Sequence, residues 1–111
     1  MAFVPASPLA EVPDGGAVAV EVEGVELALV RDGESVYAVI DECSHAAIPL
    51  SEGDVEGNEI ECWLHGSRFD LRTGKPTGLP ATEPVATFPV DVRDGDVYVD
   101  TETTLNGVTP A

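Results

Sequence analysis

The sequence predicts an all-β protein made of antiparallel sheets packed as a sandwich. Apolar residues alternate with small or charged ones over residues 17–22, 25–30 and 35–40. This period of two is typical of strands with one buried face. Dipeptides suited to tight hairpin turns separate these stretches. No stretch carries a helical repeat of apolar positions that is long enough for a stable helix, so we expect sheets and loops alone.

The first three strands are expected to form an antiparallel meander. Glu23-Gly24 connects the first strand to the second, and Asp32-Gly33 turns the chain into the third. Such pairs favour two-residue turns, whose twist matches that of the paired strands. A shift of one residue in the pairing would move every side chain to the other face of the sheet. Alternation gives the following inward-facing core candidates: Val18, Val20, Val22, Leu27, Leu29, Tyr37 and Val39.

Two further hairpins are predicted in the second half of the chain. Residues 59–62 and 68–72 form a short one, whose tip falls at His65-Gly66. Residues 85–92 and 96–100 form the last one across Asp94-Gly95, a strong signal for a two-residue turn.

The length of 111 residues fits one domain, because domains commonly have about 100 to 150 residues. We predict that this domain covers residues 1–100 and that residues 101–111 form a flexible tail, since they show neither periodicity nor enough apolar surface to pack. No apolar run approaches the roughly 20 residues that cross a bilayer. The N-terminus also lacks the features of a secretory signal, so we expect a cytoplasmic protein with reduced cysteines.

The chain is strongly acidic, with 21 acidic and 5 basic residues and a formal net charge of −16. Nucleic acids and anionic membrane surfaces are bound through Lys and Arg, so we expect neither as a partner. Two interpretations of the charge remain open. It can steer the protein toward a basic patch on a partner protein, or it can serve solubility in a salty cytoplasm.

The two cysteines and two histidines of the chain fall into two short pairs, Cys43-Ser44-His45 and Cys62-Trp63-Leu64-His65. Two loops could therefore present two thiolates and two imidazoles to one metal centre. Zinc binds such sets, although familiar zinc sites pair Cys with Cys and His with His. A [2Fe-2S] cluster would explain the mixed pairs, because both thiolates can bind one iron and both imidazoles the other.

The residues around the two pairs resemble those of Rieske iron–sulfur proteins. The resemblance rests on Pro49-Leu50-Ser51-Glu52-Gly53, on Gly66-Ser67-Arg68-Phe69-Asp70 and on Thr73-Gly74-Lys75. It implies the Rieske fold, with a small cluster-binding subdomain of two ligand loops at about residues 41–80, and one [2Fe-2S] cluster per chain. The implied ligands are Cys43, His45, Cys62 and His65.

The resemblance also implies which side chains tune the cluster. Ser67 matches a serine that donates a hydrogen bond to a cluster sulfur, whereas Phe69 replaces a tyrosine that does the same. Since a missing donor disfavours the extra electron, we expect a reduction potential toward the low end of the Rieske range of about −150 to +300 mV.

Four more residues are implied to lie near the cluster. Ile48 and Leu64 occupy the positions where Rieske subunits of quinol-oxidising membrane complexes carry two further cysteines, so that disulfide cannot form here. Gly66 is expected at the tip of the second ligand loop. Pro80 belongs to a third loop, which the resemblance implies covers one side of the cluster.

By size and motif the chain is similar to the small Rieske ferredoxins of aromatic-ring-hydroxylating dioxygenase systems. This implies a monomeric one-electron carrier between a flavin-dependent ferredoxin reductase and a terminal non-haem iron oxygenase. The cluster motif uses both histidines, so none remains for a mononuclear iron site or a histidine-activated nucleophile. We therefore predict an electron-transfer component without catalytic residues.

Three alternatives are kept. The first is an accessory Rieske subunit of a reductase, such as the small subunit of nitrite reductase. The second is a ferredoxin associated with iron–sulfur assembly. The third is an interaction module stabilised by zinc, which would be colourless.

Overall fold

The structure is a computed structural model that describes residues 3–33, 35–42, 49–62, 66–77 and 83–107. These residues form three antiparallel sheets and two short 3₁₀ helices, η1 (Leu9–Glu11) and η2 (Leu50–Glu52), and no α-helix occurs among them. The prediction of an all-β protein is therefore confirmed. No helix in the described ranges is long and apolar enough to cross a membrane.

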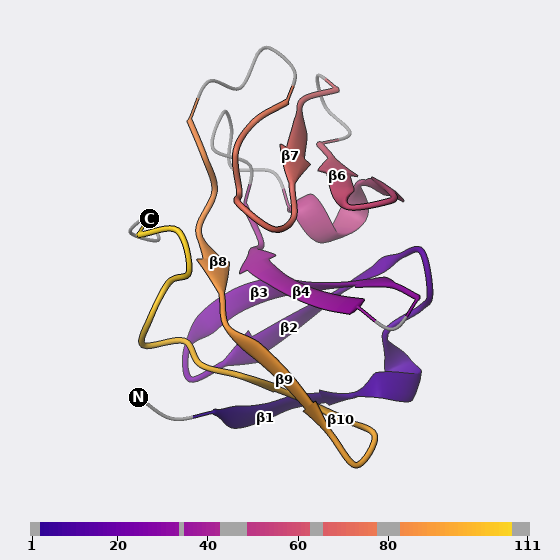
Figure 1. Ribbon diagram of the computed structural model, residues 1–111, viewed down its shortest axis with the longest axis vertical. Helices are drawn as coiled ribbons and strands as arrows, with labels where there is room; N and C mark the ends of the chain where they lie inside the picture. The colour runs from indigo at the N-terminus through magenta and orange to yellow at the C-terminus, as the bar shows by residue number, and fades with distance from the viewer. Residues whose placement is uncertain (1–2, 34, 43–48, 63–65, 78–82, 108–111) are drawn as a thin grey trace.

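Three layers are stacked along the long axis of the molecule (Figure 1). The central sheet has the strand order β2 (Ala17–Val22), β3 (Val25–Asp32), β4 (Ser35–Ile40) and β8 (Thr87–Phe88). The terminal sheet has the order β1 (Val4–Pro8), β10 (Asp96–Val99) and β9 (Val90–Arg93). The small sheet has the order β5 (Asp54–Glu56), β6 (Glu59–Glu61) and β7 (Arg68–Asp70).

The predicted meander is present, and β3 extends to Asp32 rather than stopping at residue 30. Glu23 and Gly24 have φ angles of 50° and 83°, the left-handed conformation that a tight hairpin turn of this kind requires at both positions. Val22 faces Val25 across this turn, and the register continues without a bulge to Ala17 opposite Val30. The fourth strand, β8, was not predicted as a member of this sheet.

Both faces of the central sheet are buried, which corrects the predicted single inward face. Ala28 and Val39 lie opposite each other in β3 and β4 and belong to a core toward the small sheet, against which Tyr37 also packs. Leu27 and Leu29 point to the other face. Strand alternation separates the two faces but cannot show that both are covered, because coverage depends on distant strands.

The two cores are named here by their position. The ligand-side core, between the central and small sheets, contains Ala28, Val30, Val39, Leu50, Ile60, Cys62, Phe69, Leu71 and Val85. The base core, between the central and terminal sheets, contains Val12, Val22, Leu27, Leu29, Ala38, Ala86, Phe88, Val97 and Val99. Val18 and Val20 are partly buried and pack against the base core.

The last predicted hairpin is present but begins differently. Asp94 and Gly95 take φ angles of 48° and 80°, so the turn forms as expected between β9 and β10. The predicted strand over residues 85–92 is divided at Pro89, and its two parts, β8 and β9, belong to different sheets. Proline has no N–H to donate to a ladder, which suits the point where the chain changes sheet.

Residues 105 and 106 are attached to the domain by hydrogen bonds. The Leu105 N–H donates to the Thr87 carbonyl at 2.8 Å, and the Asn106 side chain hydrogen bonds to Thr73 and Val85. The tail expected from residue 101 is therefore held at residues 105 and 106. These polar contacts join residues that are distant in the sequence, and the domain boundary at residue 100 stays a prediction.

Candidate metal centre

Of the four predicted ligands, Cys62 lies in the part of the chain that the structure describes. Cys43, His45 and His65 lie outside the described residues, as do the predicted neighbours Ile48, Leu64 and Pro80. The geometry of the centre is therefore built from Cys62 and from the described residues at the ends of the three loops.

Cys62 directly follows β6, is 1% exposed, and has no disulfide partner in the part of the chain that the structure describes. Its N–H donates to the Ser67 carbonyl at 2.6 Å, and its own carbonyl accepts from the Gly66 N–H at 3.0 Å. Gly66 has a φ of 76°, a conformation that favours glycine. The β6–β7 pairing thus confirms the predicted hairpin and holds the Cys62 backbone at the end of a short ladder.

The first ligand loop is closed at its base by Asp41 and Ser51. The Asp41 N–H donates to the Glu26 carbonyl at 3.0 Å, which anchors the chain as it leaves β4. The Asp41 carboxylate accepts from the Ser51 N–H at 2.7 Å and from the Ser51 hydroxyl at 2.8 Å. Asp41 therefore bonds to strand β3 and to the 3₁₀ helix η2. These bonds join the two ends of the segment that contains Cys43 and His45.

Gly53 brings the first loop against the second. A Cβ atom at this position would overlap the carbonyl oxygen of Glu61, the residue before Cys62. The φ of Gly53 is −86°, so glycine is required for close approach rather than for a left-handed turn. Gly53 belongs to the sequence motif that resembles Rieske proteins, and this close approach explains why a glycine stands there.

The third loop is anchored at one end to the same hairpin and at the other end to the turn that follows it. The Thr77 N–H donates to the Arg68 carbonyl at 2.7 Å, and the Val85 N–H donates to the Gly74 carbonyl at 2.9 Å. One residue later, the Ala86 carbonyl accepts from the Ile40 N–H at 2.9 Å. Strands β4, β6 and β7 and the chain entering β8 therefore bring the ends of all three loops to one region of the molecule.

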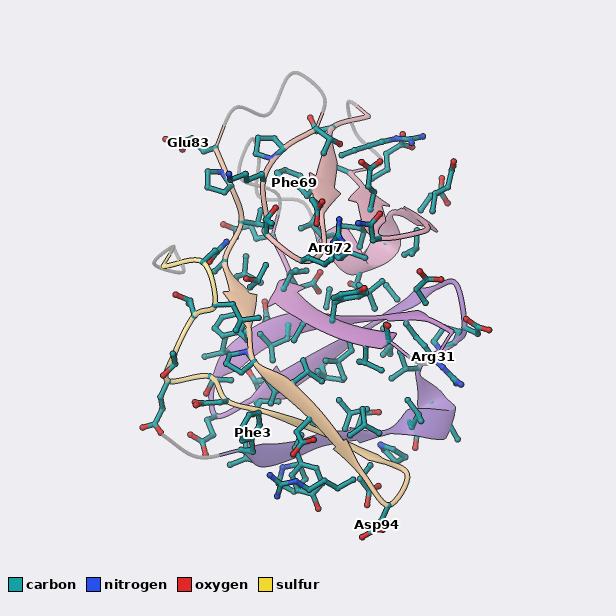
Figure 2. The ribbon with its side chains drawn as sticks, viewed as in Figure 1. Phe3, Arg31, Phe69, Arg72, Glu83 and Asp94 are labelled. Atoms are coloured by element: carbon teal, nitrogen blue, oxygen red, sulfur yellow. The ribbon has the colours of Figure 1, made fainter. Side chains whose placement is uncertain are left out.

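Figure 2 shows the position of this region relative to the rest of the molecule. Phe69 lies in the upper part of the view, near the small sheet, and Glu83 lies at the upper margin. Phe3 and Asp94 lie at the opposite end. The candidate centre is thus separated from the terminal sheet by the central sheet.

Ser67 and Phe69 are both fully buried. The Phe69 backbone pairs with Ile60, and its ring belongs to the ligand-side core together with Cys62. The phenyl ring has no hydroxyl group to donate a hydrogen bond. This burial agrees with a place near the centre, while the roles of Ser67 and Phe69 toward a cluster stay predictions.

Arg68 carries a positive charge among three glutamates on the small sheet. Its guanidinium nitrogens lie 3.2 Å from the Glu61 carboxylate, 3.7 Å from Glu59 and 3.9 Å from Glu56. The hydrogen bond and the charge of Glu61, with a further contribution from Glu56, raise the pKa of Arg68 above its usual value. The pairs link all three strands of the sheet, but Arg68 is partly exposed, so we expect each to stabilise it only weakly.

The donor set fits a [2Fe-2S] cluster held by two cysteines and two histidines. Cys62 is buried, has no disulfide partner among the described residues, and lies at the end of the hairpin that also anchors the third loop. In the described ranges, no group of three His, Cys, Asp or Glu side chains forms a competing metal site. The other predicted ligands, Cys43, His45 and His65, lie in the adjoining sequence, and their roles stay predictions.

Comparison with known proteins identifies the family. The profile of the Rieske [2Fe-2S] domain matches residues 2–89. The chain belongs to the Rieske family. The 3-phenylpropionate/cinnamic acid dioxygenase ferredoxin subunit of Escherichia coli strain K12 is 44% identical over 96 residues, which cover 86% of this chain and 90% of that protein.

Two solved structures support the same assignment. The ferredoxin of carbazole 1,9a-dioxygenase from Nocardioides aromaticivorans IC177 is 42% identical, with a TM-score of 0.85 over 89% of this chain and 97% of that one. The ferredoxin in a complex of reduced oxygenase and oxidised ferredoxin of carbazole 1,9a-dioxygenase is 37% identical. Its TM-score is 0.81 over 87% of this chain and 91% of that one.

These matches establish the cofactor and the class of protein. The chain is a Rieske ferredoxin that carries electrons through one [2Fe-2S] cluster. It is an electron-transfer component rather than a catalytic enzyme. Membership of this family does not support the alternative of a zinc-stabilised interaction module. The assignment also agrees with an all-β fold whose three loop bases meet around Cys62.

Proposed function

We propose that this chain is the ferredoxin component of a dioxygenase system that acts on an aromatic compound. It receives one electron at a time from a flavin-dependent ferredoxin reductase and passes it to a terminal non-haem iron oxygenase. The observation that carries this proposal is the 44% identity to a dioxygenase ferredoxin subunit over nearly the full length of both proteins. A related ferredoxin has been seen in complex with its oxygenase, which supports the second half of the relay.

In this proposal Cys43 and Cys62 bind one iron, and His45 and His65 bind the other. The bound cluster supplies storage for a single electron. The chain holds the thiolate of Cys62 in the ligand-side core and anchors the first loop through the Asp41–Ser51 hydrogen bonds. These contacts limit the movement of the ligands when the charge of the centre changes.

We further propose that water is excluded from the centre by Ile48, Leu64 and Pro80, and that Gly66 allows the second loop to turn. Ser67 would supply a hydrogen bond to a cluster sulfur, and Phe69 would supply none. The resulting potential lies toward the low end of the Rieske range, because hydrogen bonds to sulfur stabilise the reduced form.

The acidic charge supports an electrostatic part of partner recognition. Glu21, Glu26, Asp41 and Glu42 line a hollow between the β2–β3 turn and the base of the first ligand loop. A basic patch on a redox partner would be attracted to this side of the protein, and raising the salt concentration would slow the encounter. We propose that the protein acts as a monomer in this exchange and that the system is cytoplasmic.

Low-temperature EPR of the dithionite-reduced protein tests the proposal first, together with the visible spectrum and the iron-to-sulfide ratio. Mixed imidazole and thiolate ligands should give a rhombic signal with an average g value below that of all-cysteine [2Fe-2S] clusters. His45→Cys should keep a cluster but lower its potential, because a charged thiolate replaces a neutral imidazole. A colourless protein that contains zinc, or an unchanged potential in His45→Cys, would contradict the ligand assignment.

The relay itself is tested by mixing the reduced ferredoxin with the terminal oxygenase encoded nearest to it. Electron transfer should be fast and should slow as salt is added. Transfer to a nitrite reductase subunit instead would favour an accessory subunit of a reductase. The relatives described above, which are 37% to 44% identical, are all named for dioxygenase systems.

A further inference from the structure

Asn106 lies beyond the residues that match the Rieske domain. Its side chain nevertheless contacts the backbone next to the predicted ligand loops. Its Nδ2 atom donates to the Thr73 carbonyl at 2.8 Å and to the Val85 carbonyl at 2.7 Å. Its Oδ1 atom accepts from the Thr87 N–H at 3.4 Å. One amide group therefore bonds to three backbone positions that belong to two separate parts of the fold.

The first of these parts is the turn that follows the ligand hairpin. The Gly74 N–H donates to the Asp70 carbonyl at 2.6 Å, and the Asp70 N–H donates to the Lys75 carbonyl at 2.9 Å. This turn, which contains Thr73, is thus attached to the end of β7. Phe69, one residue earlier, shares the ligand-side core with Cys62.

The second part is the chain that enters β8. Val85 is 2% exposed and belongs to the ligand-side core, whereas Ala86 points into the base core. Thr87 pairs with Val39 of β4, so this chain is fixed to the central sheet. Asn106 consequently joins the ligand hairpin to the central sheet at the edge of the core that contains Cys62.

The junction is tightly packed. Gly74 has a φ of 75°, and a Cβ atom there would overlap the Val85 carbonyl and crowd the Nδ2 atom of Asn106. The Leu105 N–H donates to the Thr87 carbonyl at 2.8 Å, which places Asn106 beside this turn. A side chain with two N–H donors and one acceptor suits the site, because two carbonyls and one N–H face it.

We propose that Asn106 is a positioning residue for the [2Fe-2S] centre. Its amide holds the hairpin of Cys62 against the central sheet and thereby limits the access of water to the centre. The reduced centre carries one more negative charge than the oxidised centre, so water stabilises it preferentially. Loss of the amide should raise the reduction potential and speed the loss of the cluster. The link to the cluster rests on the proposed ligand role of Cys62.

The test uses the full-length, cluster-loaded protein with Asn106→Ala. We expect an upward shift of the potential, a several-fold faster loss of the cluster in the presence of an iron chelator, and faster hydrogen exchange at the Val85 amide. Asn106→Asp keeps an acceptor for the Thr87 N–H but cannot donate to the two carbonyls at neutral pH. It should therefore speed cluster loss and Val85 exchange at least as much as Asn106→Ala, while its negative charge opposes the upward shift of the potential.

Two controls separate positioning from general stability. Leu105→Ala changes an exposed neighbour and leaves its backbone hydrogen bond in place, so it should have no effect on any of the three measurements. Val99→Ala opens space in the base core, so it should lower the melting temperature without changing the potential or the exchange of the Val85 amide.

An unchanged potential and unchanged Val85 exchange in Asn106→Ala would overturn the inference, even with a Rieske EPR signal. Equal behaviour of Asn106→Ala and Val99→Ala would also overturn it, because the residue would then act on stability alone. Failure of the proposed function is distinguished by the wild-type spectrum. The Val85 N–H donates to the Gly74 carbonyl across the junction that Asn106 joins, and its exchange can be measured without the cluster.

Discussion

The central sheet and the small sheet are stabilised in different ways. Strands β2, β3 and β4 have 6, 8 and 6 residues, and β3 is buried at the four positions 27–30. Each strand of the small sheet has 3 residues, and in β6 and β7 only the middle residue is buried. Burial of apolar surface on two faces supports the first sheet, while the second has little apolar surface of its own.

The small sheet depends instead on contacts between segments that are distant in the sequence. Asp41 with Ser51, Gly53 against Glu61, and Arg68 with its glutamates connect elements that could not form a stable sheet alone. The predicted cluster-binding part is therefore assembled by a few specific contacts. It stands on a base, made of the central and terminal sheets, that folds by burying apolar residues in its cores. Single changes should therefore separate stability of the base from retention of the cluster.

The largest expected effect is on the base. Leu29→Ala should lower the free energy of unfolding by about 2–5 kcal/mol, because Leu29 is fully buried in the base core. The potential and the EPR g values of the molecules that remain folded should not change. Chemical denaturation and potentiometry measure the two quantities.

Leu71→Ala is the matched change in the ligand-side core, where Leu71 is 2% exposed. It should speed cluster loss more than Leu29→Ala does at equal loss of stability. Equal rates of cluster loss in both variants would show that both cores affect cluster retention equally. That result would contradict the distinction between the base and the cluster-binding part.

A smaller effect is expected at the contact between the first two loops. Gly53→Ala should lower the free energy of unfolding by about 1–3 kcal/mol and reduce the cluster content, because the new methyl group overlaps a backbone carbonyl. The control is Gly24→Ala at the β2–β3 turn, where φ is 83° but no atom lies near the added Cβ. Gly24→Ala should lower the free energy of unfolding by about 1 kcal/mol and leave the cluster content unchanged. Iron and sulfide analysis of both purified variants compares them, and equal cluster content would contradict the role given to Gly53.

The smallest effect on stability is expected for Phe69→Tyr. If this position faces a cluster sulfur, a new hydroxyl that stabilises the reduced form by about 1 kcal/mol would raise the one-electron potential by roughly 40 mV. Protein-film voltammetry measures the shift, and Leu71→Met serves as a buried control that adds no donor. An unchanged potential with an intact EPR signal would place the Phe69 ring away from the cluster sulfurs.

Much of the fold followed from local chemistry. The alternation over residues 17–22 and the Glu23-Gly24 and Asp94-Gly95 pairs predicted strands and turns correctly, because each is decided by neighbours along the chain. Strands β1 and β5 were missed, since three to five residues with Pro or acidic side chains carry too weak a pattern. The division at Pro89 was missed because the apolar pattern continues on both sides of it, while the change of sheet depends on distant strand partners.

The family, the cluster and the candidate ligands could be predicted from the sequence alone, because two mixed Cys and His pairs with their flanking residues form a pattern that few other sites share. The tertiary structure was needed to show that both faces of the central sheet are buried, that Asp41 binds Ser51, and that Asn106 bonds to a carbonyl 33 residues away. Such contacts join segments whose local patterns are independent of one another. Their partners are therefore defined by the packing of the sheets, which no short stretch of sequence encodes.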